Sequence, residues 1–186
     1  ENVYLGHNRL SIIDLSESGN QPMKSANSDA SIIYNGEVYN YQELKKELSG
    51  IKFNSNSDSE VVLEGYLKEG TDYFKKLRGL YAFAIYDNRQ NQKIILARDP
   101  SGIKPLYYWF NGRTIVFSSE IKAILKHPDY EKGVDLDALN QYFTFQNVFT
   151  YNTLFKGVFM LPPANTVKVT SQSTFVKHYS WWDYDF

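Results

Sequence analysis

Apolar and polar residues recur along the chain with periods that predict two strands followed by two helices. The apolar residues at 5–15 predict a first strand, and those at 32–34 predict a second strand that ends at an Asn-Gly pair. Helical spacing follows at 41–48 and at 57–69, and Gly70 ends the second helix. Asn40 with Glu43, and Ser57 with Glu60, have the spacing of capping boxes at the two helix starts.

From residue 80 the apolar period becomes that of strands. Four runs, at 81–86, 93–97, 105–110 and 114–117, are separated by short polar turns, which predicts an antiparallel meander. Apolar residues on both faces, and the small Ala82 and Ala84, predict two sheets packed on each other. We therefore expect an α+β fold with a two-sheet core flanked by helices.

The last third of the chain mixes short elements. A helix is predicted at 121–125, and Asp135 begins another in which Leu136, Leu139 and Phe143 share a face. Residues 159–163 are expected to form a turn, and 166–169 with 174–179 a last hairpin.

Composition narrows the class of protein. With 186 residues, 42% apolar and 22% charged, the chain is long enough for one domain with a sizeable core. A net charge of −1 and the lack of a long Lys/Arg run argue against nucleic acid or an anionic membrane as partner. No apolar stretch approaches the ~18 residues of a membrane span, and the first residues do not resemble a signal peptide, so we expect a cytoplasmic protein.

Metal and phosphate chemistry find little support in the residues. The sequence has no cysteine, which excludes disulfides, thiolate metal sites and a thiol nucleophile within it. Its three histidines are widely separated, so we expect no metal site. Residues 98–102 lack the glycine and lysine spacing of a phosphate-binding loop and are predicted to connect two strands, so ATP is not expected to bind there.

The Asn35-Gly36 pair is the strongest candidate for chemistry. Such a pair usually marks a hairpin, but helical spacing follows it, so the pair is predicted to join a strand to a helix. At such a junction the Gly36 N–H and the Asn35 carboxamide would both point at one developing negative oxygen, which predicts an oxyanion hole. A simple turn is the alternative.

Seven segments, in order, resemble the glutamine-hydrolysing domain of asparagine synthetases. They are residues 6–14, 21–23, 34–40, 57–61, 77–85, 97–108 and 118–123. This family belongs to the class II glutamine amidotransferases, which are N-terminal-nucleophile hydrolases. The resemblance implies an αββα sandwich of two mostly antiparallel sheets between helix layers, here truncated at its N-terminus.

The resemblance also implies an activity and a set of site residues. Glutamine would be split to glutamate and ammonia, and a second domain that uses ATP and Mg would amidate aspartate or a related carboxylate. Arg9 would hold the α-carboxylate of glutamine, and Asp58, with help from Glu37, its α-ammonium. The alternatives are a surface ion pair for Arg9 and a helix-start acid for Asp58. His7 is interpreted as structural, because the family uses the free amine of its own first cysteine as the base.

The sequence departs from the family at its start. The family opens with Cys-Gly-Ile, and Glu1 cannot replace that thiol, so we expect this chain to be inactive as given, by truncation or by natural loss. Residues 1–180 are expected to form the amidotransferase domain, incomplete at the N-terminus, and 181–186 to begin a linker to an absent synthetase domain. A missing first strand would expose a sheet edge, so we also expect self-association, with a homo-oligomer as one outcome.

Two other functions stay open. The first is a non-catalytic domain that binds glutamine or docks to a partner synthetase. The second is an amidotransferase of the glucosamine or purine type, which the run at 35–40 and the Trp182-Asp183 ending disfavour. The acceptor of the ammonia is not specified by these residues.

Overall fold

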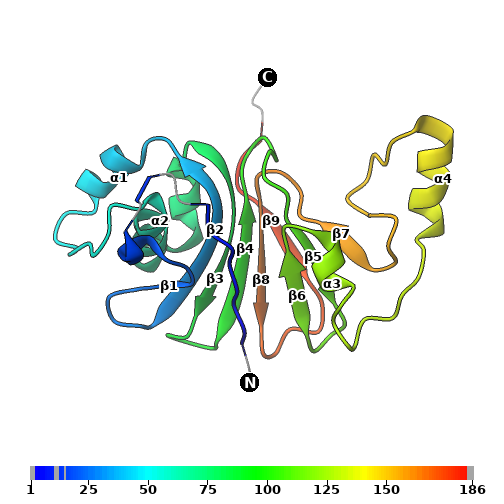
Figure 1. The fold of residues 1–186 in the computed structure, drawn as a ribbon, viewed down its shortest axis with the longest axis horizontal. Helices are drawn as coiled ribbons and strands as arrows, with labels where there is room; N and C mark the ends of the chain where they lie inside the picture. The colour runs from blue at the N-terminus through cyan, green and yellow to red at the C-terminus, as the bar shows by residue number, and fades with distance from the viewer. Residues whose placement is uncertain (1–2, 11–12, 15, 184–186) are drawn as a thin grey trace.

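The computed structural model describes residues 3–10, 13–14 and 16–183, and Figure 1 shows how their elements follow one another. The strands are β1 (Met23–Lys24), β2 (Ala30–Val38), β3 (Gly79–Asp87), β4 (Lys93–Arg98), β5 (Tyr107–Phe110), β6 (Ile115–Ser118), β7 (Val158–Met160), β8 (Asn165–Thr170) and β9 (Lys177–Ser180). The α-helices are α1 (Tyr41–Glu47), α2 (Asp58–Glu69), α3 (Ile121–Ile124) and α4 (Leu136–Phe145). Two 3-10 helices, η1 and η2, occupy Glu17–Gly19 and Gly70–Lys76.

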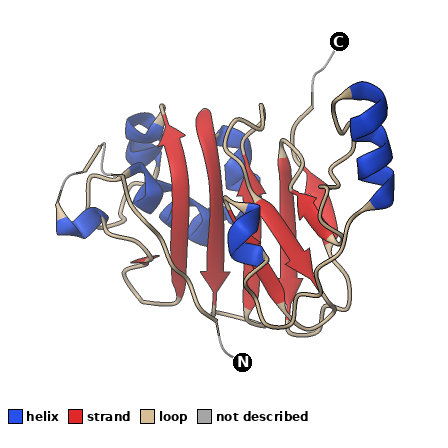
Figure 2. Ribbon diagram, turned by 45° about the vertical axis from the view of Figure 1, so that its right-hand side comes forward, coloured by secondary structure: helices blue, strands red, loops and turns tan. Residues whose placement is uncertain are grey.

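The strands form two sheets, both visible in Figure 2. The larger sheet has the order β1-β2-β3-β4-β8-β9, and the smaller has the order β6-β5-β7. Every pair of neighbouring strands is antiparallel. The two-sheet, mixed α+β prediction is confirmed.

The layers follow from which faces are apolar. Helices α1 and α2 bury Leu44 and Val61, together with Leu48 at the end of α1, against one face of the larger sheet. On its other face, Ala84 and Leu96 pack with residues of the smaller sheet, whose outer side is covered by α3. The order helix, sheet, sheet, helix is the predicted αββα sandwich. Helix α4 lies apart from these layers, at the right of Figure 1.

The predicted strand-to-helix junction at Asn35-Gly36 is wrong. Strand β2 continues through the pair to Val38, and its register with β3 is unbroken, from Ala30 opposite Asp87 to Val38 opposite Gly79. Helix α1 starts only at Tyr41. The turn tendency of the pair is overridden because long-range pairing with β3 supplies a ladder partner for each residue. The pair therefore belongs to a strand of the larger sheet and not to a turn.

The strand predicted at residues 5–15 is not formed in its described part. Residues 5–10, 13 and 14 belong to no strand, and residues 11, 12 and 15 lie outside the described residues. Apolar spacing alone does not make a strand, because the backbone also needs a partner ladder. The segment instead borders two cavities, and Gly6 lines both of them.

The predicted meander is divided between the two sheets. Strand β4 pairs with β3 and β8, whereas β5 pairs with β6 and β7. The chain passes from the larger to the smaller sheet in a turn after β4. The fully buried Asp99 carboxylate holds this turn by accepting hydrogen bonds of 3.0 Å from the N–H groups of Ser101, Ile103 and Lys104. Residues 159 and 160, expected in a turn, belong to β7.

The helix starts agree only in part with the predicted caps. The Asn40 side chain makes no capping bond and instead contacts the backbone at 76 and 78. Asp135 does cap α4, accepting from the Ala138 N–H at 2.9 Å, but Leu136 and Phe143 on that helix are 74% and 76% exposed. The predicted apolar face of α4 is thus present but uncovered.

Of the predicted linker at 181–186, residues 184–186 lie outside the described residues. Within the described ranges, no helix has both the length and the apolar character needed to cross a membrane.

Candidate active site

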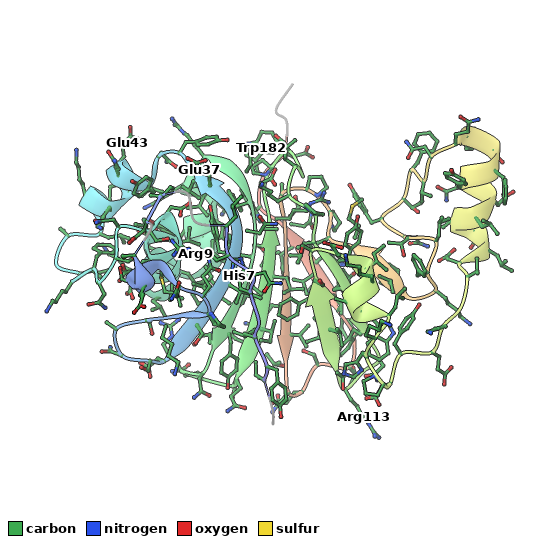
Figure 3. All side chains as sticks on the ribbon, viewed as in Figure 1. His7, Arg9, Glu37, Glu43, Arg113 and Trp182 are labelled. Carbon is green, nitrogen blue, oxygen red and sulfur yellow. The ribbon has the colours of Figure 1, made fainter. Side chains whose placement is uncertain are left out.

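A cavity of about 680 Å³ opens beside strand β2 and the start of α2. Figure 3 shows Glu37 near the upper end of β2 and Arg9 and His7 on the N-terminal segment. All five residues predicted to form the site line this cavity: Arg9, Asn35, Gly36, Glu37 and Asp58. The structure therefore brings together groups that are up to 49 positions apart in the sequence, although their roles stay predictions.

The free edge of β2 supplies the backbone donor of the site. Strand β1 pairs only with Ser31 and Ile32, so from residue 33 onward β2 has no strand partner on that side among the described residues. There the Tyr34 N–H donates to Gln21 Oε1 at 2.6 Å, and the Val38 N–H donates to Asp58 Oδ2 at 2.9 Å. The two-residue period of a strand directs the intervening Gly36 N–H toward the same edge. The Gly36 N–H therefore lies between two backbone N–H groups, those of Tyr34 and Val38, that already donate to side chains.

The packing of β2 against β3 leaves no room for a side chain at position 36, so only glycine fits there. Its φ is +151°, and a Cβ at this position would lie 2.1 Å from the Leu80 carbonyl oxygen and 2.6 Å from Tyr81 Cα. The neighbouring Asn35 side chain is exposed and makes no hydrogen bond to any described residue. The carboxamide of Asn35 and the N–H of Gly36 are thus both available to a ligand.

Asp58 is the first residue of α2 and is held there by strand β2. Ser57 caps the helix by accepting from the Ser59 N–H, while Glu60 turns back to the backbone N–H groups of residues 54 and 55 instead of completing the predicted box. Asp58 Oδ2 accepts from the Tyr34 hydroxyl at 2.8 Å and from the Val38 N–H. The carboxylate is only 4% exposed, yet it borders the cavity.

Arg9 carries a positive charge to the other side of the cavity. Its guanidinium donates to the carbonyl oxygens of Asp14 and Ser16 and lies against the backbone of Gly19. No ion pair joins Arg9 to an acid in the part of the chain that the structure describes, so the surface ion pair considered for it is not found. The charge is available to an anionic ligand group.

Asp14 ties the N-terminal segment to the start of α2. Its carboxylate accepts from the Ser16 hydroxyl at 2.6 Å, the Ser16 N–H at 2.9 Å and the Asn56 N–H at 2.9 Å. These bonds, with that of the Ser16 hydroxyl largest, lower the pKa of Asp14 to about 2. Because Asn56 lies two residues before Asp58, this link sets the spacing between Arg9 and Asp58.

His7 and Glu37 are two further ionisable residues that line the cavity. Burial lowers the pKa of His7, the nearby Arg9 lowers it further, and a hydrogen bond with the Tyr34 backbone opposes both, so the imidazole is neutral at pH 7. His7 Nδ1 is buried and has no partner among the described residues. Glu37 is half-buried, and its carboxylate forms no ion pair with another described residue.

Several lining residues were not assigned a role from the sequence. They are Gln21, Tyr34, Lys104, Ser118, Ser119 and Glu120. All six fall inside the segments that carry the family resemblance, and that placement was the available signal. Their meeting depends on the change of sheet after β4, which no local pattern specifies.

The lining suits a ligand with both charges and a carbonyl group. A guanidinium binds a carboxylate through parallel hydrogen bonds, and carboxylates bind an ammonium group. Two neutral donors on adjacent residues suit an oxygen that gains negative charge. No cluster of three or more His, Cys, Asp or Glu side chains able to hold a metal occurs among the residues described.

Comparison with known proteins decides the family. A model of the glutamine amidotransferase domain matches residues 1–182. The chain belongs to this family. The amidotransferase domain is 41% identical over 170 residues to asparagine synthetase [glutamine-hydrolyzing] 3 of Bacillus subtilis (strain 168), an alignment that covers 89% of the chain and 27% of that protein. It is 34% identical over 197 residues to putative asparagine synthetase [glutamine-hydrolyzing] 2 of Methanocaldococcus jannaschii, covering 97% and 38%.

The solved structures agree on the fold of the amidotransferase domain. Glutamine phosphoribosylpyrophosphate amidotransferase from B. subtilis matches it with a TM-score of 0.63 and 21% identity, over 94% of this chain and 34% of that one. At that identity the likeness shows the fold alone. The recognition of a class II amidotransferase domain of asparagine synthetase-like proteins is confirmed. The domain spans between a quarter and two-fifths of the length of the curated relatives reported above.

Proposed function

We propose that this chain is the glutaminase domain of an asparagine synthetase-like amidotransferase. It would release ammonia from glutamine for the ATP-dependent amidation of aspartate or a related carboxylate. The observation that carries the proposal is the common cavity lined by Arg9, Asn35, Gly36, Glu37 and Asp58. The identity to glutamine-hydrolysing asparagine synthetases supports it.

In the proposed site each charged group of glutamine has a partner of opposite charge. Arg9 binds the α-carboxylate, and Asp58, with Glu37, binds the α-ammonium. The side-chain amide then lies beside Asn35 and Gly36, which stabilise the negative oxygen of the tetrahedral intermediate. One oxyanion donor in comparable sites is worth about 2.7 to 4 kcal/mol of transition-state stabilisation.

The nucleophile is proposed to be a thiol supplied from outside these 186 residues, since the sequence contains no cysteine. The chain alone is therefore proposed to be inactive. Residues 1–180 would form the amidotransferase domain and 181–186 would begin the linker to a synthetase domain, where ATP and Mg would bind.

Ammonia release tests the proposal. The chain is fused to an N-terminal segment of a relative that opens Cys-Gly-Ile, and ammonia is measured with L-glutamine as substrate. The fusion is expected to hydrolyse glutamine, and Asn35→Ala is expected to lower its kcat by about 10²- to 10³-fold. Asn27→Ala, a change at an exposed site outside the cavity, is the matched control and should leave kcat unchanged. Full activity in Asn35→Ala would contradict the oxyanion role, and hydrolysis by the unfused chain would contradict the external nucleophile.

A non-catalytic domain is the second candidate. The observation that favours it is that the proposed binding residues are present in a sequence without cysteine. Such a domain would bind glutamine, yet its fusion to the Cys-Gly-Ile segment would release no ammonia.

A further inference from the structure

Tyr34 connects the strand that carries Asn35 to the residue proposed to bind the ammonium group. Its hydroxyl donates to Asp58 Oδ2 at 2.8 Å, and both side chains are 4% exposed. Its ring stacks on Phe83, with centroids 6.2 Å apart and planes at 23°. The hydroxyl is therefore fixed by packing and excluded from bulk water. In such a buried environment a hydrogen bond to a charged group is stronger than in water.

The hydrogen bonds to Asp58 leave one acceptor position unused. Oδ2 takes the Tyr34 hydroxyl and the Val38 N–H, and Oδ1 takes the Ser59 N–H at 3.0 Å. An ionised carboxylate offers about four lone-pair positions, so three described donors leave one, on Oδ1. With Oδ2 held by two donors of β2, the rotation of the carboxylate is fixed and the open position has one direction.

We propose that Tyr34 is a positioning residue that orients Asp58 toward the ammonium group of an amino-acid ligand. The role rests on the proposed function, because it assumes that Asp58 binds that group. Successive residues of a strand point to opposite faces, so Tyr34 points to the side of the sheet where Asp58 lies and Asn35 points to the other side, and both border the cavity. One dipeptide thereby fixes both the oxyanion donor and, through Asp58, the position of the ammonium group. Ligands whose amino group and amide are spaced as in glutamine are selected.

The state of the phenol is consistent with a donor role. Burial, with the negative charge of Asp58 next to it, raises the pKa of Tyr34 well above its ordinary value. The hydroxyl thus keeps its proton across the neutral range and can donate it to the Asp58 carboxylate.

Binding of two ligands to Tyr34→Phe tests the role. L-Glutamine and its des-amino analogue, 4-carbamoylbutanoate, are titrated into the chain by calorimetry. Tyr34→Phe is expected to weaken glutamine about tenfold, the scale of one hydrogen bond to a charged group, and to change the des-amino analogue by less than about twofold. In an Asp58→Asn background the same change should cost glutamine nothing more, because Tyr34 acts through Asp58.

Tyr66→Phe is the matched control. The Tyr66 hydroxyl also donates to a buried carboxylate, Asp87 Oδ2 at 2.6 Å, but neither residue borders the cavity. This variant loses an equivalent hydrogen bond and should bind glutamine as the unmodified chain does.

Each outcome decides something. Equal weakening of both ligands, or none, overturns the positioning role. If the unmodified chain binds neither ligand, the proposed function is contradicted. If the unmodified chain binds glutamine and Tyr34→Phe binds it with the same affinity, only the role of Tyr34 is contradicted. If Tyr34→Phe does not fold, 3,5-difluorotyrosine at position 34 keeps the hydroxyl and lowers its pKa, so glutamine binding should weaken at a lower pH than in the unmodified chain. An unshifted pH profile would overturn the role.

Discussion

Replacing Gly36 by alanine tests whether strand β2 runs through the Asn-Gly pair. In the structure the new methyl group would lie 2.1 Å from the Leu80 carbonyl oxygen and 2.6 Å from Tyr81 Cα. Both atoms belong to the backbone of β3, which cannot move aside without breaking the ladder. Were the pair the end of a strand, the methyl group would have room.

Two effects add in this variant. Alanine at a φ of +151° is strained, which costs about 1 to 3 kcal/mol. Overpacking against a fixed neighbour costs about 1 to 3 kcal/mol more. The free energy of unfolding of Gly36→Ala is therefore expected to fall by about 2 to 6 kcal/mol.

Gly50→Ala separates the two effects. Gly50 has a φ of +87°, and a Cβ there would meet nothing within 4 Å, so only the backbone strain remains. Urea unfolding followed by circular dichroism gives both free energies. The Gly36 variant should be less stable than the Gly50 variant by about 1 to 3 kcal/mol. A difference below about 0.5 kcal/mol, the size of an ordinary surface change, would refute the register assigned to β2.

Three further predictions concern stability and association. Asp87 is fully buried and bonds Tyr66, Arg89 and Lys93, so Asp87→Asn should lower the free energy of unfolding by about 2 to 4 kcal/mol in urea, and an unchanged midpoint would contradict the pairing. The folded-state pKa of Asp14 is lowered to about 2 from 3.8, so its contribution, about 1 to 2 kcal/mol, is present above 3.8 and lost as the pH falls through about 2. Asp14→Asn should therefore flatten the stability profile between those values, and an identical acid limb would count against the assigned bonds. The chain should self-associate in light scattering through the exposed face of α4, and Phe143→Ser, at a residue 76% exposed, should shift it toward monomer; a monomeric parent chain would dismiss that expectation.

Local patterns predicted most elements but not their partners. The period-two runs located β3, β4, β5 and β6, and their two-faced apolar character predicted two packed sheets. Which sheet each strand joins depends on the turn built around Asp99, whose four backbone donors come together only in the folded chain. The same limit explains why the described part of the strand predicted at 5–15 is not formed, since its apolar residues have no ladder partner among the described residues.

The residues of the site could be predicted from the sequence, whereas their geometry could not. Asn35 and Gly36 were singled out from their own chemistry, although the reason given, a strand-to-helix junction, is wrong. The structure supplies a different reason, because Gly36 lies at a free strand edge between two N–H groups that are already bonded. Arg9 and Asp58 needed the family resemblance, since an isolated arginine or helix-start acid has a structural explanation of its own. Tyr34 was missed because an apolar-looking strand position does not show that its hydroxyl reaches a carboxylate.

We propose that one cavity beside β2 binds glutamine through Arg9, Asn35, Gly36 and Asp58. It is tested most directly by titrating L-glutamine into the isotopically labelled chain and following backbone amide resonances by NMR. We expect saturable shifts centred on residues 34–38 and 58–59, abolished by Arg9→Met and much weaker with D-glutamine. Shifts that are absent, or that map instead to the second cavity around Tyr4, Lys93 and Arg113, would contradict it.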